Sequence, residues 1–485
     1  MITRTQDHRM YVAGDWTPGA SARRLEATSP ATGEPIGTVP EGTREDARRA
    51  ILAANDAWPA WAARSAFERA AAMDRVADLI EERRDHLAYT LTLDQGKPLH
   101  AEAYDEVDEL VVYFRMAAAD ATRLDGSMPP SVDATKRVFL HRVPRGVVGV
   151  ITPWNWPYTM PAELLAPALA SGNAVVWSPA SSTSICAVGL AECIADAELP
   201  PGVFNMITGP GSEVGDEIAA SPGTQAIGFV GSTATGRRVA ERAAGKATLL
   251  EMGGNGPMVI LEDADLDAAA EATLASAFLC AGQSCTAGER FLVHERVYDG
   301  FLARLEAAIG RGLRLGDPFS PETTMGPLNN ETTASKMDRH VADALDRGAE
   351  LLRGGSRAGG FPTRLYYEPT VLGGVTEEME VAREETFGPI VPVTAIRDEA
   401  EALRTINSSP YGLLTAVWTG DLARGLRFAE SVRTGWVNVN ASSNHWESHL
   451  PFGGRAGSRS GIGRVGGRYP METFTELKTV ILSLR

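Results

Sequence analysis

The sequence predicts an α/β protein built on parallel sheets, and two observations support this. From residue 146 onward, short apolar runs that end at Gly or Pro alternate with helical segments, which is typical of parallel strands joined by helices. The chain has 485 residues, of which 44% are hydrophobic and 22% charged, as in ordinary globular proteins. This length predicts two or three domains.

The N-terminal part is expected to be helical over residues 44–123, where apolar residues recur at helical spacing. Thr43 stands before the first of these helices and Asp46 follows three residues later, which predicts an N-cap. Residues 137–143 alternate in part between apolar and polar side chains and predict a strand.

Four strands are expected next, with helices starting near residues 161 and 183. The four strands are residues 146–151, 174–177, 203–207 and 226–230. After Glu251 a second alternation begins, with a strand at 257–260 and an Ala-rich helix at 266–280. A last apolar strand is expected at 477–484. If its edge is unpaired, it would tend to pair with a strand of another chain.

Composition excludes several classes of protein. The net charge of −16 argues against a nucleic-acid partner, because such binding needs clustered Lys and Arg. The four cysteines have no zinc-like spacing, so we expect no metal site, a reducing compartment and no structural disulfide. The N-terminus lacks a signal-like apolar region and no stretch matches a membrane span, which predicts a cytoplasmic protein without a membrane partner.

A thiol and a carboxylate stand in two glycine-marked motifs, residues 250–255 and 282–290. The Cys285 thiolate would be a strong nucleophile, and Glu251, placed after an apolar strand, would be desolvated and act as a general base. The alternatives are a buried inert cysteine and an exposed glutamate at a strand end. For Cys280, expected on the preceding apolar helix, we favour the inert role.

Asn155 lies between two tryptophans and two prolines, which restrict the backbone. A rigid amide can donate to a developing oxyanion, an interaction typically worth ~3 kcal/mol. The alternative is an ordinary Asx-turn residue.

Two glycine-containing loops suggest a dinucleotide site. Gly211 and Gly215 belong to a G-x-G-x-x-x-G run, one residue longer than the usual dinucleotide fingerprint. Gly231 and Ser232 follow a strand and open a helix, where N–H groups can bind a pyrophosphate. Ser232 can also be a simple N-cap, and the two roles are compatible.

These motifs, together with residues 384–389, 451–454 and 460–464, resemble the aldehyde dehydrogenase family in the same order over nearly the whole chain. The resemblance implies a Rossmann-type cofactor domain, an α/β catalytic domain, and an oligomerisation arm that pairs with a neighbouring subunit's sheet in a homodimer or homotetramer. The expected boundaries are 1–121 and 145–253 for the cofactor domain, 254–457 for the catalytic domain, and 122–144 with 458–485 for the arm and C-terminal tail.

The implied reaction oxidises a small-molecule aldehyde to a carboxylic acid, with hydride transfer to NAD(P)+. Cys285 would form the thiohemiacetal and thioester, Asn155 and the Cys285 N–H would bind the oxyanion, and Glu251 would activate water. A CoA-acylating semialdehyde dehydrogenase is disfavoured because that branch lacks the glutamate. A non-catalytic binding or structural relative should have lost Cys285 or Glu251, and both are present.

The resemblance also implies a set of cofactor-binding residues: Trp154, Ser178, Ser181, Gly211, Gly215, Gly231, Ser232, Gly253, Glu385 and Phe387. The chain departs from the family at two of them, because Ser178 and Ser181 replace the lysine and glutamate that usually hold the adenosine ribose. We therefore expect modest discrimination between the cofactors, with a slight lean to NAD and NADP possible.

A substrate tunnel is expected on the other side of Cys285, with aromatic walls and one acidic position, Glu163. If Glu163 faces the tunnel, it would repel a distal carboxylate and disfavour dicarboxylic semialdehydes. Equally, Glu163 can cap or face a neighbouring helix. The expected lining residues are Trp156, Met160, Glu163, Ser284, Thr286, His445, Trp446 and Phe452.

Overall fold

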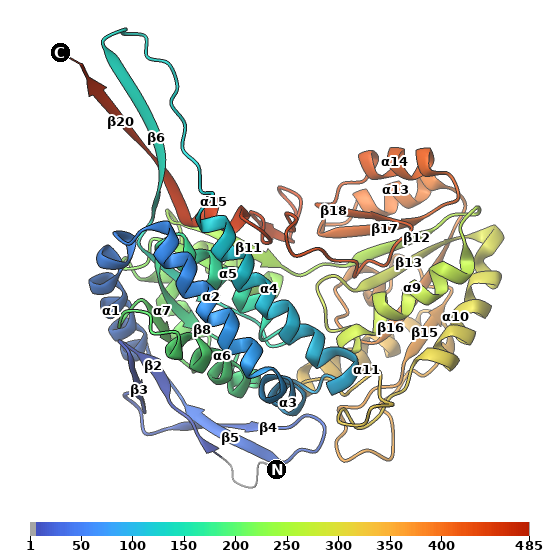
Figure 1. Cartoon of the computed structure of the whole chain (residues 1–485). Coiled ribbons are helices and arrows are strands. Elements are labelled where there is room, and N and C mark those ends of the chain that lie inside the picture. Colours follow the sequence, from blue (N-terminus) through green and yellow to red (C-terminus); the bar gives the residue numbers. More distant parts are fainter. Residues whose placement is uncertain (1–5, 485) are drawn as a thin grey trace.

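The computed structural model describes residues 6–484 and contains two sheet-and-helix units with a projecting two-stranded arm (Figure 1). The first unit is an eight-stranded sheet in the order β19-β11-β10-β7-β8-β9-β2-β3, of which β11, β10, β7, β8 and β9 run parallel. Its strands are β2 (Met10–Val12), β3 (Asp15–Thr17), β7 (Val147–Ile151), β8 (Ala174–Ser178), β9 (Phe204–Met206), β10 (Ala226–Gly231), β11 (Ala247–Met252) and β19 (Gly461–Ile462).

Alternating strand residues pack on opposite faces of this sheet. Val148 and Val150 of β7 belong to one buried cluster, whereas Val147 belongs to another. The first cluster contains α2 (Ala66–Glu82), α3 (Arg84–Gln95), α4 (Tyr104–Ala121), α5 (Thr159–Ala170), α6 (Ser184–Asp196) and α15 (Tyr469–Phe474). The second contains α1 (Arg44–Ala62), α7 (Val214–Ala220) and α8 (Thr233–Arg242).

The second unit is a seven-stranded sheet in the order β14-β15-β16-β13-β12-β17-β18, parallel except for β14. Its strands are β12 (Gly256–Ile260), β13 (Gly288–His294), β14 (Glu350–Arg353), β15 (Thr370–Gly373), β16 (Ile390–Ile396), β17 (Leu414–Trp418) and β18 (Trp436–Val439). Its helices are α9 (Leu266–Phe278), α10 (Tyr298–Gly312), α11 (Glu331–Asp346), α12 (Glu380–Arg383), α13 (Glu399–Asn407) and α14 (Leu422–Ser431).

The α/β prediction is confirmed, and so is the N-cap. The Thr43 hydroxyl accepts from the Asp46 N–H, and the Asp46 carboxylate accepts from the Thr43 N–H at 3.0 Å. The sequence pattern did not predict the three-stranded sheet β1-β5-β4 at the N-terminus. These strands are β1 (Gln6–Asp7), β4 (Arg24–Thr28) and β5 (Pro35–Pro40).

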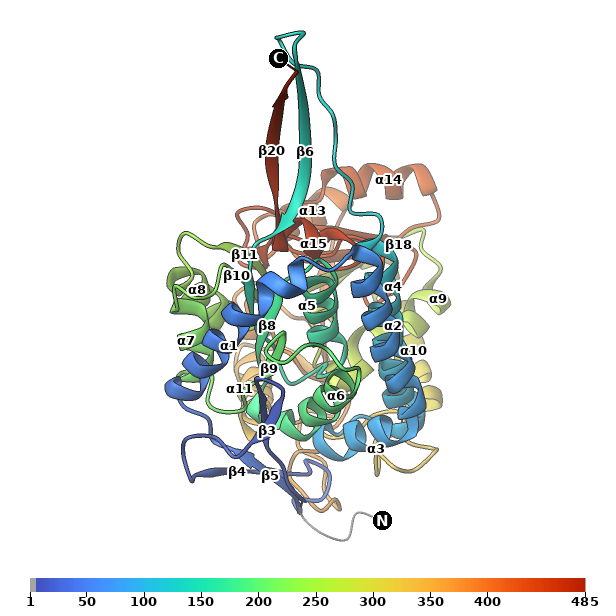
Figure 2. The ribbon, with the colours of Figure 1, turned by 60° about the vertical axis from the view of Figure 1, so that its left-hand side comes forward.

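The arm is an antiparallel pair of β6 (Lys136–Pro144) and β20 (Thr475–Ser483), seen clear of the body in Figures 1 and 2. Both strands were expected, and they pair with each other within one chain, whereas the expected pairing with a neighbouring subunit's sheet stays a prediction. The outer face of β20 stays exposed, including Leu477 (59%) and Ile481 (57%). Between residues 6 and 484, no helix is long and apolar enough to cross a membrane.

A buried ion pair fixes the start of α4. Lys97 Nζ lies 2.5 Å from Glu106 Oε2, and both side chains are fully buried. The other Glu106 oxygen accepts from the N–H groups of Tyr158 (3.0 Å) and Thr159 (3.3 Å), where α5 begins. Lys97 Nζ also lies 3.1 Å from the centre of the Trp156 ring. The pair therefore joins α4 to the segment 153–157.

The adjacent π-helical turn η1 (Leu99–Ala103) makes a second connection. The Glu102 carboxylate accepts from the Cys280 N–H at 3.0 and 3.1 Å. One short stretch of chain thus holds the loops that carry both Asn155 and Cys285.

Replacing Lys97 with methionine should leave Glu106 as an uncompensated buried charge. We expect Lys97→Met to lower the free energy of unfolding by about 3–5 kcal/mol, measured by urea denaturation. The double variant Lys97→Met/Glu106→Gln should recover at least half of the loss, because glutamine removes the charge and keeps an acceptor for α5. A single variant within about 1 kcal/mol of the parent would contradict this role.

Candidate functional site

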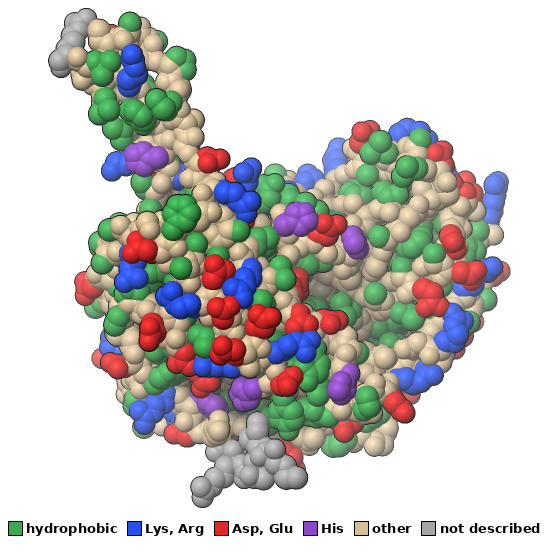
Figure 3. Space-filling view, in the orientation of Figure 1, with side chains coloured by type: hydrophobic (Ala, Val, Ile, Leu, Met, Phe, Trp, Pro, Cys, Tyr) green, Lys and Arg blue, Asp and Glu red, His purple; other side chains and the backbone are tan. Residues whose placement is uncertain are grey.

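Two cavities meet at Cys285, in the hollow between the two units that Figure 3 shows. One has a volume of about 500 Å³ and the other about 670 Å³. Cys285, Glu251 and Met160 line both cavities. The thiol and the carboxylate that the sequence singled out are therefore placed where two ligands could meet.

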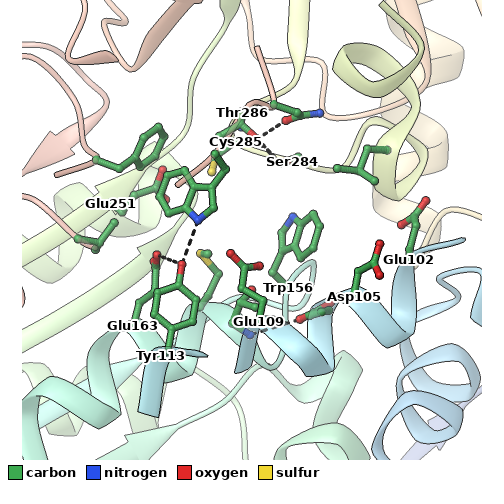
Figure 4. Close-up of a pocket in the computed structure, with 18 of the residues that line it drawn as sticks. Glu102, Asp105, Glu109, Tyr113, Trp156, Glu163, Glu251, Ser284, Cys285 and Thr286 are labelled. Carbon is green, nitrogen blue, oxygen red and sulfur yellow. Dashed lines mark hydrogen bonds between the residues drawn. The ribbon is translucent and has the colours of Figure 1, made fainter. Parts of the chain in front are cut away.

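The smaller cavity, here called the acid-lined pocket, extends between α4, α5 and the loop after β18 (Figure 4). All eight residues that were expected to line a substrate tunnel line this pocket. The pocket also contains an acidic row from η1 and α4 that the sequence analysis missed. This row consists of Glu102, Asp105, Glu106 and Glu109, followed on α4 by Tyr113.

The larger cavity, here called the cleft, extends along the carboxyl ends of β10 and β11 toward α11. Seven of the ten predicted cofactor residues line the cleft. They are Trp154, Ser181, Gly231, Ser232, Gly253, Glu385 and Phe387. The cleft also contains Lys336 and Arg339 of α11, which the sequence analysis missed.

Three predicted cofactor residues do not line the cleft. Ser178 is the last residue of β8 and is only 2% exposed. Gly215 is buried in α7 and packs on Ile151 of β7, where a Cβ would make only an ordinary contact with Ile151 Cδ1 at 3.6 Å. A Cβ on Gly211 would meet no atom within 4 Å, and this residue stands apart from the cleft lining.

The loop that carries Cys285 has an unusual backbone. Helix α9 ends at Phe278, and Cys280 and Ala281 have φ values of 53° and 52°. Cys280 therefore lies in a left-handed turn and not on the helix, which corrects the sequence expectation. At Gly282, where φ is 74°, a Cβ would lie 2.3 Å from the Gly388 carbonyl oxygen, so only glycine fits.

The segment that carries Asn155 contacts this loop directly. Asn155 Nδ2 donates to the Gln283 carbonyl at 2.9 Å, and the residue is 5% exposed. An amide nitrogen has two hydrogens, so one remains for another acceptor. The Cys280 thiol donates to the Asn155 carbonyl at 3.5 Å. Asn155 is thus fixed beside the residues that lead to Cys285.

Where the two cavities meet, burial favours the protonated forms of Glu251 and Cys285. Burial raises the pKa of Glu251 to about 8. The hydrogen bond with the Cys285 thiol opposes this rise, and the negative charge of Glu385 adds to it. One Glu251 oxygen has no hydrogen-bond partner within the described chain. Burial and the Glu251 carboxylate raise the pKa of the Cys285 thiol well above its usual value. The thiol therefore needs a nearby proton acceptor to react, and Glu251 is adjacent.

Glu385 and Phe387 lie together at the edge of the cleft. The Glu385 carboxylate accepts from the Gly254 N–H at 2.9 Å, and a Cβ on Gly253 would lie 2.6 Å from Glu385 Oε2. Phe387 adopts a φ of 61°, a strained value for a non-glycine residue. Its ring packs edge-on against Trp154, with 5.7 Å between the ring centres. The Glu289 carboxylate holds this conformation by accepting from the Phe387 N–H at 2.6 Å.

Glu163 faces the pocket and a neighbouring helix at once. Its Oε1 accepts from the Tyr113 hydroxyl of α4 at 2.6 Å, and Trp446 Nε1 donates to the same hydroxyl at 3.1 Å (Figure 4). Burial raises the pKa of Glu163 well above its usual value. This shift favours the protonated form, which would weaken the repulsion of an anion that the sequence predicted.

The site as a whole can support covalent chemistry on a carbonyl carbon. It combines a nucleophilic thiol, a carboxylate whose pKa is near neutrality, and an amide donor beside them. The acid-lined pocket could hold the carbonyl compound on one side, and the cleft could hold a second ligand on the other.

Comparison with known proteins identifies the family. The chain matches the model of the aldehyde dehydrogenase family over residues 16–480. It is 38% identical over 478 residues to the NADP(+) succinate-semialdehyde dehydrogenase of Escherichia coli (strain K12), covering 98% of this chain and 97% of the relative. It is 39% identical over 476 residues to the glutarate-semialdehyde dehydrogenase of Pseudomonas aeruginosa, covering 97% of each chain.

A solved structure agrees with the sequence relatives. The structure of the succinate-semialdehyde dehydrogenase from Burkholderia pseudomallei superposes with a TM-score of 0.95 at 39% identity, covering 98% of both chains. The protein oxidises an aldehyde to a carboxylic acid with hydride transfer to NAD(P). The chain therefore belongs to the aldehyde dehydrogenase family.

Proposed function

We propose that Cys285, Glu251 and Asn155 form the catalytic centre of this aldehyde dehydrogenase. The observation that carries the proposal is that Cys285 and Glu251 line both cavities, with Asn155 in the wall beside them. An aldehyde in the acid-lined pocket and a cofactor in the cleft would approach the same sulfur from two sides.

In the first step Glu251 accepts the proton of the Cys285 thiol, and the sulfur bonds to the aldehyde carbon. The free Asn155 N–H and the Cys285 backbone N–H donate to the oxygen of the thiohemiacetal. Once the aldehyde hydrogen has left as hydride, Cys285 carries a thioester. After Glu251 has released the first proton to solvent, it takes a proton from water and the hydroxide attacks the thioester carbon. The carboxylic acid leaves, and Glu251 returns its proton to the Cys285 thiolate to restore the thiol.

The cleft suits a nicotinamide dinucleotide, which when bound supplies the hydride acceptor. Ser232 lines the cleft and caps the N-terminus of α8, an end of a helix that would suit a pyrophosphate. Glu385 offers a carboxylate to ribose hydroxyls, and Gly253 leaves the space beside it open. Phe387, held by Glu289, presents a ring to the nicotinamide.

The cleft has no strong anchor for a 2′-phosphate. Among its described lining residues, the cations are Lys336, which donates to the Glu385 carbonyl at 3.2 Å, and Arg339, which donates to Glu380 at 2.9 Å. Ser181 donates to the Gly209 carbonyl at 3.0 Å and offers no charge to either cofactor. We therefore propose modest discrimination with a slight lean to NAD.

We also propose a cytoplasmic homodimer or homotetramer. The exposed apolar side chains of β20 support an oligomer, and the four cysteines, all free, suit a reducing compartment. A division into residues 1–121 with 145–253, 254–457, and 122–144 with 458–485 is supported by the two sheets and the arm. The tail also contributes β19 to the first sheet.

Removing the nucleophile and removing the base should have different effects. Cys285→Ala should abolish NADH formation, whereas Glu251→Gln should still form about one NADH per site, slowly, and then stop. Steady-state turnover of Glu251→Gln should fall by about 10²–10⁴-fold. Stopped-flow absorbance and intact mass of the thioester would check this. Near-normal turnover by Cys285→Ala would contradict the mechanism.

The CoA-acylating and non-catalytic alternatives are tested in the same assay. Steady NADH release without CoA is expected, with no more than a twofold change when CoA is added. Release only with CoA would support acyl transfer, and no release with any aldehyde would support a binding role.

The activity should rise with pH through the Glu251 pKa. Only the ionised carboxylate can accept a proton, so kcat should fall about tenfold per pH unit below a pKa of about 8 and level off above it. Measurement of kcat from pH 6.5 to 9.5 at saturating substrates would check this. A profile that is flat across this range would assign the base to another group.

Cofactor preference should be weak. The ratio of kcat/KM for NAD and NADP should stay within about 30-fold, or about 2 kcal/mol, since neither gains a charged hydrogen bond at position 181. Ser181→Glu should tighten NAD and weaken NADP, because a carboxylate accepts from ribose hydroxyls and repels a 2′-phosphate. A thousandfold preference in the parent enzyme would point to a residue outside the set described.

A further inference from the structure

The acid-lined pocket has a charge that does not suit the substrates named for the relatives. Succinate and glutarate semialdehydes carry a carboxylate, which a lysine or arginine would bind most strongly. Across residues 6–484, no lysine or arginine lines this pocket, whereas five acidic residues other than Glu251 do. Figure 3 shows acidic side chains gathered on the α2 and α4 side of the hollow.

We infer that the substrate of this enzyme is an aliphatic aldehyde with a positively charged ammonium group at its far end, held by Asp105 and Glu109 of α4. The inference rests on the proposed function, in which the aldehyde group reaches Cys285. The chain between the two groups would follow the aromatic wall.

The acidic residues form an ordered row. Asp105, Glu109 and Tyr113 are spaced by four residues and share one face of α4, so they mark a line along the pocket. Asp105 is exposed at the mouth, Glu109 is partly buried, and Tyr113 is buried beside Glu163. In Figure 4, Glu102, Asp105 and Glu109 face Trp156, with Tyr113 and Glu163 toward the Glu251 side.

Two of these carboxylates make no direct contact with a cationic side chain of the described residues. Glu106 is paired with Lys97, and Glu102 accepts from the Cys280 N–H. In contrast, Asp105 and Glu109 form no ion pair with any described residue, although like charges four residues apart destabilise a helix. Burial and the Glu106 charge raise the pKa of Glu109 to about 7, so a bound cation would stabilise its charged form.

The aromatic wall is also suited to an ammonium group. Trp156, Trp446 and Phe452 line the pocket, and the last two rings meet edge-on at 4.6 Å. Lys97 Nζ already occupies one face of the Trp156 ring, at 3.1 Å from its centre. Aromatic faces combined with carboxylates are the usual surroundings of bound organic ammonium groups.

The test compares three aldehydes that differ in charge. They are 4-(trimethylammonio)butanal, its neutral carbon isostere 5,5-dimethylhexanal, and succinic semialdehyde. For the parent enzyme, kcat/KM should be at least tenfold higher for the cation than for the isostere, and lowest for the anion. Equal values for cation and isostere, or a preference for the anion, would overturn the inference while NADH release from the isostere would still support the proposed function.

Variants identify the residues responsible. Glu109→Gln should lower kcat/KM for the cation by about tenfold, leave the isostere within about twofold, and raise it for the anion. The matched control is Asp108→Asn on the same helix, whose carboxylate pairs with Arg84 at 2.6 Å away from the pocket and should change none of the three. An equal loss on all three aldehydes with Glu109→Gln would assign it a structural role.

Inhibition of the parent enzyme gives a measurement that needs no variant. Butyltrimethylammonium chloride should inhibit oxidation of 5,5-dimethylhexanal competitively, whereas sodium butyrate at the same concentration should not. Inhibition by butyrate alone, or by neither salt, would overturn the inference.

Discussion

The buried contact between Lys97 and Glu106 holds the site together. Its two charges are removed from water, so each depends on the other and on the few polar groups that reach them. Because Glu106 also binds the start of α5, and Lys97 lies on Trp156, the pair fixes the direction in which the segment of Asn155 approaches Cys285. The same helix then presents its acidic face to the pocket. The contact between Lys97 and Glu106 on α4 therefore determines both where the Asn155 amide lies and which acidic side chains face the pocket.

Rigidity at the cysteine loop has a similar source. The chain turns sharply after α9, because Cys280 and Ala281 adopt left-handed backbone angles and are followed by Gly282, which no other residue could replace. Two hydrogen bonds stabilise this turn: Glu102 accepts from the Cys280 N–H, and Asn155 donates to the Gln283 carbonyl. A sulfur at the meeting point of two cavities needs such support, because small displacements of a reacting atom are costly.

Much of this could be predicted from sequence. The parallel strands were visible because each buried run ends at Gly or Pro, and Cys285, Glu251 and Asn155 stood out because their neighbours are unusual. The acidic row of η1 and α4 was missed because acidic residues on a helix usually face water. The local sequence does not show that Glu102 contacts a loop nearly 180 residues away. Ser178 was misjudged for the opposite reason. It is close to Ser181 in sequence, but the end of a buried strand hides it. Strands β1 and β4 were missed because they are short and most of their side chains are exposed or half-buried.

The two strands of the arm are synthesised at very different times. Strand β6 leaves the ribosome roughly 330 residues before its partner β20. At 5–20 residues per second, β6 waits on the order of 20–60 s without its partner. During that time it is open to pairing with the nascent chains of neighbouring ribosomes. A chain that stops before β20 cannot complete the arm.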